Sequence, residues 1–122
     1  MKALLLVAHG SRRQQSNDEV DKLADQLRER CGQEYQIVHA AFLELADTLI
    51  PDGIGRCAQE GATEIVVLPY FLNSGRHVIT DIPEEVDSVR DELPDVDIKL
   101  ASHLGASSVM LDLLVDTANS TA

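Results

Sequence analysis

The chain opens with the apolar run Ala3-Leu4-Leu5-Leu6-Val7-Ala8, and His9-Gly10-Ser11 follows it directly. The run has the length of a strand, and no polar residue alternates with the apolar ones. Strands of this kind are buried on both faces, as the central strands of parallel sheets are. We therefore expect residues 3–8 to form a strand of a parallel sheet that is covered on both faces, with His9 at the carboxyl end of the strand.

Three further runs of strand length follow, and segments with helical periodicity separate them. The runs cover residues 36–43, 64–72 and 96–101. Alternating strands and helices indicate an α/β fold in which helices cover both faces of the sheet. The sequence thus predicts a three-layer sandwich, with a four-stranded parallel sheet flanked by helices and a flavodoxin-like winding. Because no linker or repeat interrupts the 122 residues, we expect residues 1–122 to form a single domain.

Capping signals and apolar stripes place the helices. Ser16 and Glu19 have the spacing of a capping box at the start of the first helix. A third apolar stripe extends over residues 78–93. The last helix is expected over residues 109–115, and residues 118–122 are expected to form a frayed tail.

The balance of charges excludes several classes of partner. Asp and Glu number 21 against 10 Lys and Arg, a formal net charge of -11, which disfavours nucleic acid and anionic membranes. Aromatic residues make up only 3%, too few for a base-stacking platform. No apolar run approaches the roughly 20 residues that a membrane-spanning helix needs, and no secretory signal pattern is present. Cys31 and Cys57 are interpreted as free thiols in a reducing compartment, so we expect a cytoplasmic protein.

Histidines gather at one predicted edge of the sheet. In open parallel sheets, ligands bind beyond the carboxyl ends of the strands. His9 follows the first strand there, His77 follows the third, and His103 follows the fourth. Imidazole is the commonest protein ligand of divalent transition metals, and it also transfers protons. His9 and His77 are therefore candidate metal ligands and proton acceptors, while His103 is either a turn residue or a functional one.

A carboxylate adds to this candidate site. Glu44 ends the second apolar strand, where partial desolvation would make the carboxylate more basic. The alternative is that Glu44 caps the following helix or pairs with a nearby arginine. His39 lies inside the same strand and is interpreted as a histidine of the core or of the sheet face.

Arginines lie in the same loops as the two candidate histidines. Three of the ten basic residues are placed there, namely Arg12, Arg13 and Arg76. A guanidinium group binds carboxylates bidentately, so an acidic small molecule would find its cations here. Arg13 is interpreted equally well as a solvated loop charge. The sequence thus predicts an acidic body with a local cationic rim.

The first loop does not match other known loop motifs. It lacks the Gly-x4-Gly-Lys pattern of a P-loop and the GxGxxG pattern of dinucleotide-binding loops. The Arg-His-Gly signature of histidine phosphatases would need an arginine where Ala8 stands. Ser11 lacks the G-x-S-x-G elbow of a serine nucleophile. No HExxH motif or Cys/His cluster indicates a closed zinc site.

Five stretches, in order along the chain, match one known family: Leu5-Leu6-Val7-Ala8-His9-Gly10-Ser11-Arg12, Ala41-Phe42-Leu43-Glu44, Val67-Leu68-Pro69-Tyr70-Phe71-Leu72, Gly75-Arg76-His77-Val78 and Asp81-Ile82-Pro83. They resemble the small sirohydrochlorin chelatases, the short CbiX-type class II chelatases. The resemblance implies a chelatase-like fold. It also implies a lyase that inserts a divalent metal into the tetrapyrrole sirohydrochlorin, on the way to cobalamin, sirohaem or a nickel tetrapyrrole.

The resemblance also implies roles for individual residues. The two metal-handling histidines of the family fall on His9 and His77, and its strand-end acid falls on Glu44. The metal, Co²⁺ first and Ni²⁺ or Fe²⁺ otherwise, is a substrate, and no permanently bound cofactor is expected. Because longer members of the family contain two such units, a single unit is expected to form a homodimer whose subunits share the cleft.

In the mechanism that we expect, His9 and His77 hold the metal and accept the pyrrole protons, while Glu44 acts as a base or orients an imidazole. The tetrapyrrole is expected to contact Ser11, Arg12, Arg13, Asn73, Ser74, Gly75 and Arg76. Two alternatives stay open. One is a non-catalytic module that binds or delivers Co²⁺ or Ni²⁺, and the other is a phosphate-ester hydrolase with His9 as its nucleophile.

Overall fold

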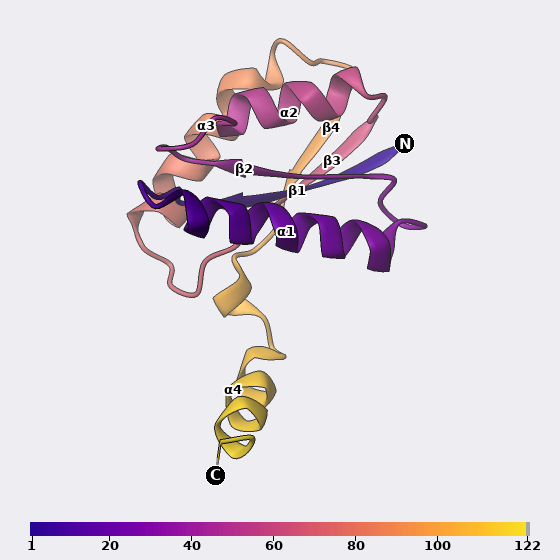
Figure 1. The fold of residues 1–122 in the computed structure, drawn as a ribbon. Coiled ribbons are helices and arrows are strands. Elements are labelled where there is room, and N and C mark those ends of the chain that lie inside the picture. The colour runs from indigo at the N-terminus through magenta and orange to yellow at the C-terminus, as the bar shows by residue number, and fades with distance from the viewer. Residues whose placement is uncertain (122) are drawn as a thin grey trace.

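The computed structural model describes residues 1–121 and contains one parallel sheet between helices (Figure 1). Its strands are β1 (Lys2–Ala8), β2 (Ile37–Phe42), β3 (Glu64–Pro69) and β4 (Asp97–Leu100). Its α-helices are α1 (Gln14–Cys31), α2 (Ile50–Gln59), α3 (Ile82–Arg90) and α4 (Met110–Asn119). A π-helical turn (His77–Asp81) precedes α3, and a 3₁₀ turn (Leu104–Ala106) precedes α4.

The sheet has the strand order β2-β1-β3-β4, and every pair is parallel. In this register Leu5 of β1 lies between His39 of β2 and Val67 of β3. Helix α1 covers one face of the sheet, and α2 and α3 cover the other (Figure 1). The α/β fold with a four-stranded parallel sheet and flavodoxin-like winding is therefore confirmed.

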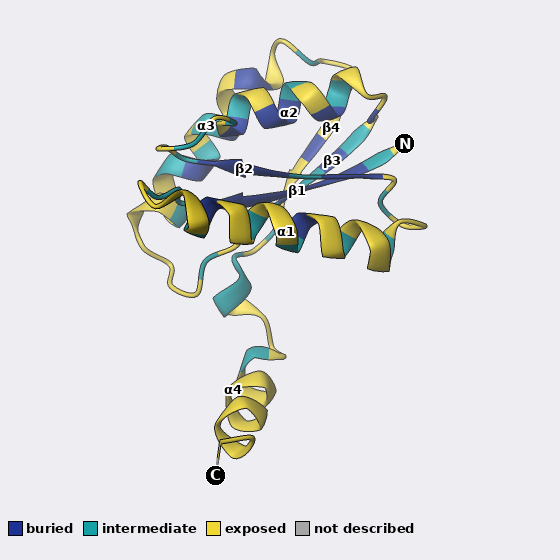
Figure 2. Cartoon of the chain, in the orientation of Figure 1, coloured by how far each residue is buried: buried dark blue, intermediate teal, exposed yellow. Residues whose placement is uncertain are grey.

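Strand β1 is buried on both faces because its alternate side chains enter two separate cores (Figure 2). Leu5 and Val7 pack in one core with Ile54 of α2 and Ile82 of α3. Leu4 packs in the other core, on the side of α1. Full burial of such a side chain contributes roughly 1.5–3 kcal/mol. The first apolar run thus forms a strand packed on both faces, and His9 follows its carboxyl end.

Helix α1 begins earlier than predicted, so Ser16 lies in its first turn and the capping box with Glu19 is wrong. A tertiary contact sets the start of the helix instead. Asn17, only 4% exposed, accepts a hydrogen bond from the backbone N–H of Ser11 and donates to the carbonyls of Ser11 and Leu45. The loop that carries His9 is thereby tied to the first turn of α1.

The third apolar stripe begins as a wider helix. The N–H of Ile82 donates to the carbonyl of His77, five residues back, and α3 then continues to Arg90. Pro83, in the first turn of α3, has no N–H to donate, which favours such a local change of helical hydrogen bonding. Strand β3 also ends at Pro69, before the predicted residue 72, so the loop that leads to His77 is longer than the sequence indicated.

Helix α4 does not cover the sheet. It extends away from the carboxyl edge of the strands, and all of its residues after the half-buried Met110 are exposed (Figures 1 and 2). It ends at Asn119, so the helix includes two residues of the segment 118–122 that the sequence assigned to a tail. Ala122, the last residue of that segment, lies outside the described residues. The prediction that helices flank the sheet therefore holds for α1, α2 and α3.

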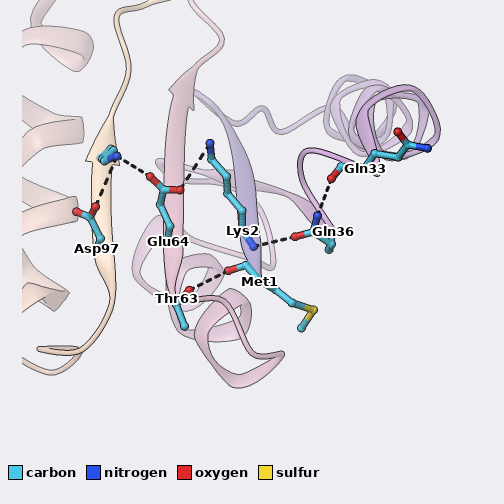
Figure 3. A network of polar contacts seen from close by, with 8 residues as sticks. Met1, Lys2, Gln33, Gln36, Thr63, Glu64 and Asp97 are labelled. Carbon is cyan, nitrogen blue, oxygen red and sulfur yellow. Dashed lines mark hydrogen bonds and ion pairs between the residues drawn. The ribbon is translucent and has the colours of Figure 1, made fainter.

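Charged side chains link the amino ends of the strands (Figure 3). Glu64 of β3 lies between Lys2 of β1, with Nζ at 3.6 Å, and Lys99 of β4, with Nζ at 2.6 Å. The hydrogen bond from Lys99 lowers the pKa of the Glu64 carboxyl group. Asp97 adds a contact of 3.6 Å with Lys99. These ion pairs lie at the end of the sheet opposite to His9.

The cysteines and the helices agree with two further expectations. Cys31 and Cys57 are both free thiols. Cys57 is fully buried, and burial raises the pKa of its thiol to about 11. Among residues 1–121, no helix combines the length and the apolar character that crossing a membrane requires.

Candidate functional site

The carboxyl edge of the sheet brings three of the predicted site residues together. His9 follows β1, Glu44 follows β2, and His77 begins the π-helical turn after β3. The ring centroids of His9 and His77 are 4.5 Å apart, and the rings are tilted by 57°. His9 Nε2 lies 3.4 Å from Glu44 Oε1. Residues separated by more than thirty positions in the sequence thus converge on one point.

A tight crossing of two loops holds His9 beside Glu44. The N–H of Glu44 donates to the carbonyl of His9 at 3.1 Å, and the N–H of Leu43 donates to the carbonyl of Ala8 at 3.1 Å. Gly10 has φ of +96°, and a Cβ there would lie 1.7 Å from the carbonyl oxygen of Glu44. Only glycine combines this backbone conformation with such a close approach.

The hydrogen bonds of the two imidazoles determine which nitrogen carries the proton. His9 Nδ1 lies 3.0 Å from the carbonyl oxygen of Gly10, and His77 Nδ1 lies 2.7 Å from Asp81 Oδ2. A carbonyl and a carboxylate only accept, so Nδ1 donates in each ring, and in a neutral ring Nε2 then carries the lone pair. Both histidines therefore present the nitrogen that metals and protons bind.

Asp81 is a site residue that sequence reasoning missed. In the sequence, Asp81 belongs to the family-like stretch Asp81-Ile82-Pro83, from which no role for it follows. Its carboxylate is half-buried and orients the ring of His77 through the 2.7 Å hydrogen bond. The spacing of four residues from His77 was the available signal, because residues at i and i+4 meet on one helix face. Using that signal requires knowing that the helix already begins at His77.

A small cavity of about 150 Å³ lies in front of the two histidines. Apart from Leu43, its lining consists of titratable side chains: His9, Glu44, His77, Asp81, Glu84 and Glu85. A water molecule occupies about 30 Å³ in the liquid. The cavity therefore has room for one cation together with about four water molecules. Four carboxylates and no Lys or Arg line it, which favours a cation electrostatically.

The site is open rather than a preformed cage. The side chains of His9 and His77 are 42% and 48% exposed. Within residues 1–121, no group of three or more His, Cys, Asp or Glu side chains is close enough to form a ready metal centre. Two imidazoles with a carboxylate nearby can hold a divalent ion while leaving coordination positions for incoming ligands.

The candidate substrate residues lie around the cavity and do not line it. Ser11 is half-buried in the loop after β1, and Arg12 and Arg13 follow it at the exposed surface. The loop between β3 and His77 is exposed and carries Asn73, Ser74, Gly75 and Arg76. Arg12, Arg13 and Arg76 are thus exposed in the two loops that carry His9 and His77, and none of them lines the cavity.

The other two histidines are outside the cavity. His39, on the sheet face, has Nε2 2.7 Å from Glu60 Oε1, and this contact is the main cause of the lowered pKa of the Glu60 carboxyl group. His103 precedes the 3₁₀ turn Leu104–Ala106. A larger groove of about 410 Å³ runs beside β2, but its lining includes neither His9 nor His77. Its Arg28 is engaged with Asp25 and with the carbonyl of Val38.

Comparison with known proteins identifies the family. Residues 3–121 match the model of the CbiX family. The chain is 36% identical over 113 residues to a chloroplastic sirohydrochlorin ferrochelatase of Arabidopsis thaliana. The aligned residues make up 93% of this chain and 49% of that protein. It is 30% identical over 142 residues to a sirohydrochlorin cobaltochelatase of Methanocaldococcus jannaschii, which covers 97% of this chain and 98% of that protein.

Solved structures agree. SirB from Bacillus subtilis with Fe³⁺ matches with a TM-score of 0.83 and 29% identity, over 94% of this chain and 45% of that chain. A CbiX protein from Marinobacter aquaeolei matches with a TM-score of 0.79 at 24% identity, over 99% of this chain and 97% of that one, and supports the fold. The chain spans about half the length of two of its curated relatives, 49% and 45%, and nearly all of others. The chain therefore belongs to the CbiX family.

Proposed function

We propose that this protein is a sirohydrochlorin chelatase, a lyase that inserts a divalent metal into the tetrapyrrole sirohydrochlorin in cobalamin or sirohaem biosynthesis. The observation that carries the proposal is the convergence of His9, His77 and Glu44 on one acidic cavity. The family and the names of its relatives supply the substrate. Co²⁺ is the first candidate metal, and Ni²⁺ and Fe²⁺ are the others.

In the proposed mechanism, His9 and His77 hold the metal through their free Nε2 atoms. Each ring is oriented from behind, His9 by the carbonyl of Gly10 and His77 by Asp81. Two neutral imidazoles bind Co²⁺, Ni²⁺ or Fe²⁺ and leave coordination positions for the ring nitrogens of the substrate. The metal can then move from two protein nitrogens to four pyrrole nitrogens. Because the protein site is open, no closed ligand cage has to break for this transfer.

Insertion also requires two pyrrole N–H protons to leave. As the metal moves to the macrocycle, the Nε2 atoms of His9 and His77 become free to accept them. Glu44 Oε1 faces His9 Nε2 at 3.4 Å, so a proton or cation between these two atoms is stabilised by both. Glu44 therefore acts as a third ligand to the metal or as the acceptor that receives the proton from His9.

The tetrapyrrole lies across the opening of the cavity, because about 150 Å³ is too small to enclose a macrocycle. Its peripheral carboxylates extend outward, toward Arg12, Arg13 and Arg76 on the rim. Ser11, Asn73, Ser74 and Gly75 offer hydrogen-bonding groups in the same two loops. The acidic cavity attracts the metal and the rim attracts the carboxylates, so each charge serves a different substrate.

We propose a homodimer as the working unit, located in the cytoplasm. Relatives of about twice this length have room for a second unit of the same size within one chain. A second copy of this chain would supply the equivalent half. Two free cysteines, one of them fully buried, suit a reducing compartment.

The two alternatives, a phosphate-ester hydrolase and a metal-delivery module, fit the cavity unequally. A phosphate ester is disfavoured, because four carboxylates surround His9 and no Lys or Arg lines the cavity. A non-catalytic metal-delivery module would use the same ligands as a chelatase. Only the reaction with the tetrapyrrole separates these two functions.

The test is an anaerobic assay with sirohydrochlorin and Co²⁺, Ni²⁺ or Fe²⁺ in turn, followed by the absorbance of the macrocycle. We expect the wild-type protein to accelerate the spectral change, and His9→Ala and His77→Ala to lose most of the acceleration. His103→Ala is the matched control, since His103 does not line the cavity, and it should retain full activity. Metal binding without acceleration would identify a delivery module and contradict the proposal.

A further inference from the structure

Helix α4 carries a broad apolar face that no other described residue covers. Val109 and Leu111 are 64% and 73% exposed, Leu113 is 54% exposed, and Leu114 and Val115 are each 57% exposed. At 100° per residue, Asp112, Asp116 and Asn119 fall on one narrow stripe. The rest of the circumference is apolar except for Thr117, whose hydroxyl donates to the carbonyl of Leu113 within the helix. A helix with so wide an apolar face is normally buried by a partner.

The same surface continues into a groove beside the helix. The groove has a volume of about 430 Å³, with Tyr70, Phe71 and Leu72 on one side and Met110, Leu113 and Leu114 on the other. Tyr70 and Leu72 are themselves 42% and 65% exposed. Exposed apolar patches of this extent mark interaction sites in soluble proteins.

The groove is held in a fixed position. Gly105 donates its N–H to the carbonyl of Phe71 at 3.0 Å, and a Cβ at Gly105 would lie 1.7 Å from the carbonyl oxygen of Leu72. The 3₁₀ turn before α4 is therefore locked against the segment that follows β3. The base of α4 is anchored at the carboxyl edge of the sheet, on the chain segment that leads to His77.

We infer that α4 and the segment Tyr70–Leu72 form the interface with a second copy of this chain, with the α4 of each copy seated in the groove of the other. The inference rests on the homodimer proposed above and assigns the surface through which it forms. Exchange of the same element between two copies gives a closed two-fold interface. The partner's α4 then fills the groove and covers the side of α4 that lines it.

Charge favours a second copy over a membrane. Helices that bind membrane surfaces carry Lys and Arg on their polar face. The polar stripe of α4 holds Asp112 and Asp116, and the sequence has no Lys or Arg after Lys99. The formal net charge of -11 also makes contact through most other surfaces repulsive. Helix α4 carries only two charges in ten residues, as few as α2, and unlike α2 it buries no residue in the core.

The exposed apolar area is sufficient for a stable pair. A fully exposed Leu or Val side chain presents about 100 Å² of apolar surface. Scaled by the exposed fractions, the α4 side chains with Tyr70 and Leu72 offer about 400 Å² per copy, or about 800 Å² per pair. Interfaces of this kind are about two-thirds apolar, so the pair would bury about 1,200 Å² in total. That value reaches the lower end of the range for specific, stable interfaces.

The interface would also complete the substrate site. Leu72 is followed directly by residues 73–76 and then by His77, so a partner seated on Leu72 lies next to the loop that carries Arg76.

The test is the mass of the full-length protein in solution, measured by light scattering or sedimentation at micromolar concentrations. We expect the wild type to have twice the monomer mass of 13.3 kDa. The double variant Leu111→Glu with Leu114→Glu should dissociate to monomers while its circular dichroism and thermal unfolding remain those of a folded sheet, because neither side chain belongs to a core. Asn119→Glu places the same side chain on the polar stripe and should leave the dimer intact.

Three results would overturn the inference. A monomeric wild-type protein would overturn the inference. If that monomer also sediments with phospholipid vesicles, the apolar surface of α4 is assigned to a membrane instead. A dimer that survives the double variant, or one that Asn119→Glu dissociates equally, would show that α4 is not the interface. Chelatase activity is measured separately. A monomer with activity therefore refutes the homodimer and its interface but not the chelatase activity, and a dimer without activity refutes the chelatase activity alone.

Discussion

The contact between His77 and Asp81 predicts that the site depends on a residue behind the metal ligand. Asp81 Oδ2 accepts the hydrogen bond of His77 Nδ1 at 2.7 Å. Asp81→Ala removes that acceptor, so the ring gains rotational freedom and the tautomer with a free Nε2 is no longer selected. We expect weaker Co²⁺ binding and slower metal insertion, with the fold unchanged.

The exposure of the pair sets the size of the effect. Loss of such an outer partner of a metal-binding histidine costs about 10- to 100-fold in affinity or activity. The side chains of Asp81 and His77 are 34% and 48% exposed, so water replaces part of the lost contact. The loss should therefore lie at the lower end of this range of about 10- to 100-fold. We expect about a tenfold loss of Co²⁺ affinity, or about 1.4 kcal/mol. Asp81→Asn keeps an acceptor oxygen but loses the charge, and about a threefold loss is expected.

The assay is an anaerobic Co²⁺ titration followed by the visible absorbance of the bound ion, together with initial rates of insertion. Glu84→Gln is the matched control, because it removes a carboxylate from the same cavity and makes no hydrogen bond to His77. It should change the affinity less than twofold, within the small range of exposed charge contacts. The reasoning is refuted if Asp81→Ala binds Co²⁺ as tightly as the wild type. Equal losses in Glu84→Gln and Asp81→Ala would also refute it, since they would indicate charge alone.

Three further predictions concern the supports of the site and the core. Gly10→Ala should destabilise the fold by more than about 3 kcal/mol, because a positive φ and a carbonyl oxygen at 1.7 Å both oppose a Cβ. Gly55→Ala, where a Cβ meets open space within α2, should instead stabilise the fold by about 0.5–1 kcal/mol. Thermal unfolding measures both changes. Asn17→Ala should cost about 1–3 kcal/mol in urea unfolding, because buried backbone groups lose their partners; an unchanged midpoint would contradict this. The thiol pKa of Cys57, about 11 in the folded protein, exceeds the unfolded value of about 8.5. Because the folded state therefore retains this proton longer, stability should fall as the pH rises from about 8.5 to about 11, and Cys57→Ala should reduce that slope.

Much of the fold and the centre of the site could be predicted from local patterns. The uninterrupted apolar run at residues 3–8 indicated a strand buried on both faces, and β1 is central in the sheet. The rule that parallel strands present ligands at their carboxyl ends then brought His9, Glu44 and His77 together, and the structure places them side by side.

The parts that were missed depend on tertiary contacts. The start of α1 follows from Asn17, whose partners include Leu45, 28 residues away, and no local capping signal reports such a contact. Asp81 was missed because its link to His77 depends on a helix that begins in a π-helical turn. For α4, periodicity predicts an apolar face but not which surface covers it, and the structure leaves that face uncovered by the rest of the described chain.

In the proposed mechanism, His9 and His77 together hold the metal that is inserted. The most direct test is a crystal of the protein soaked anaerobically with Co²⁺ and measured at the cobalt absorption edge. We predict one anomalous peak between the Nε2 atoms of His9 and His77, on the side of Glu44, and its loss in His77→Ala crystals. A peak at His39 or His103 with none in this cavity would contradict the account.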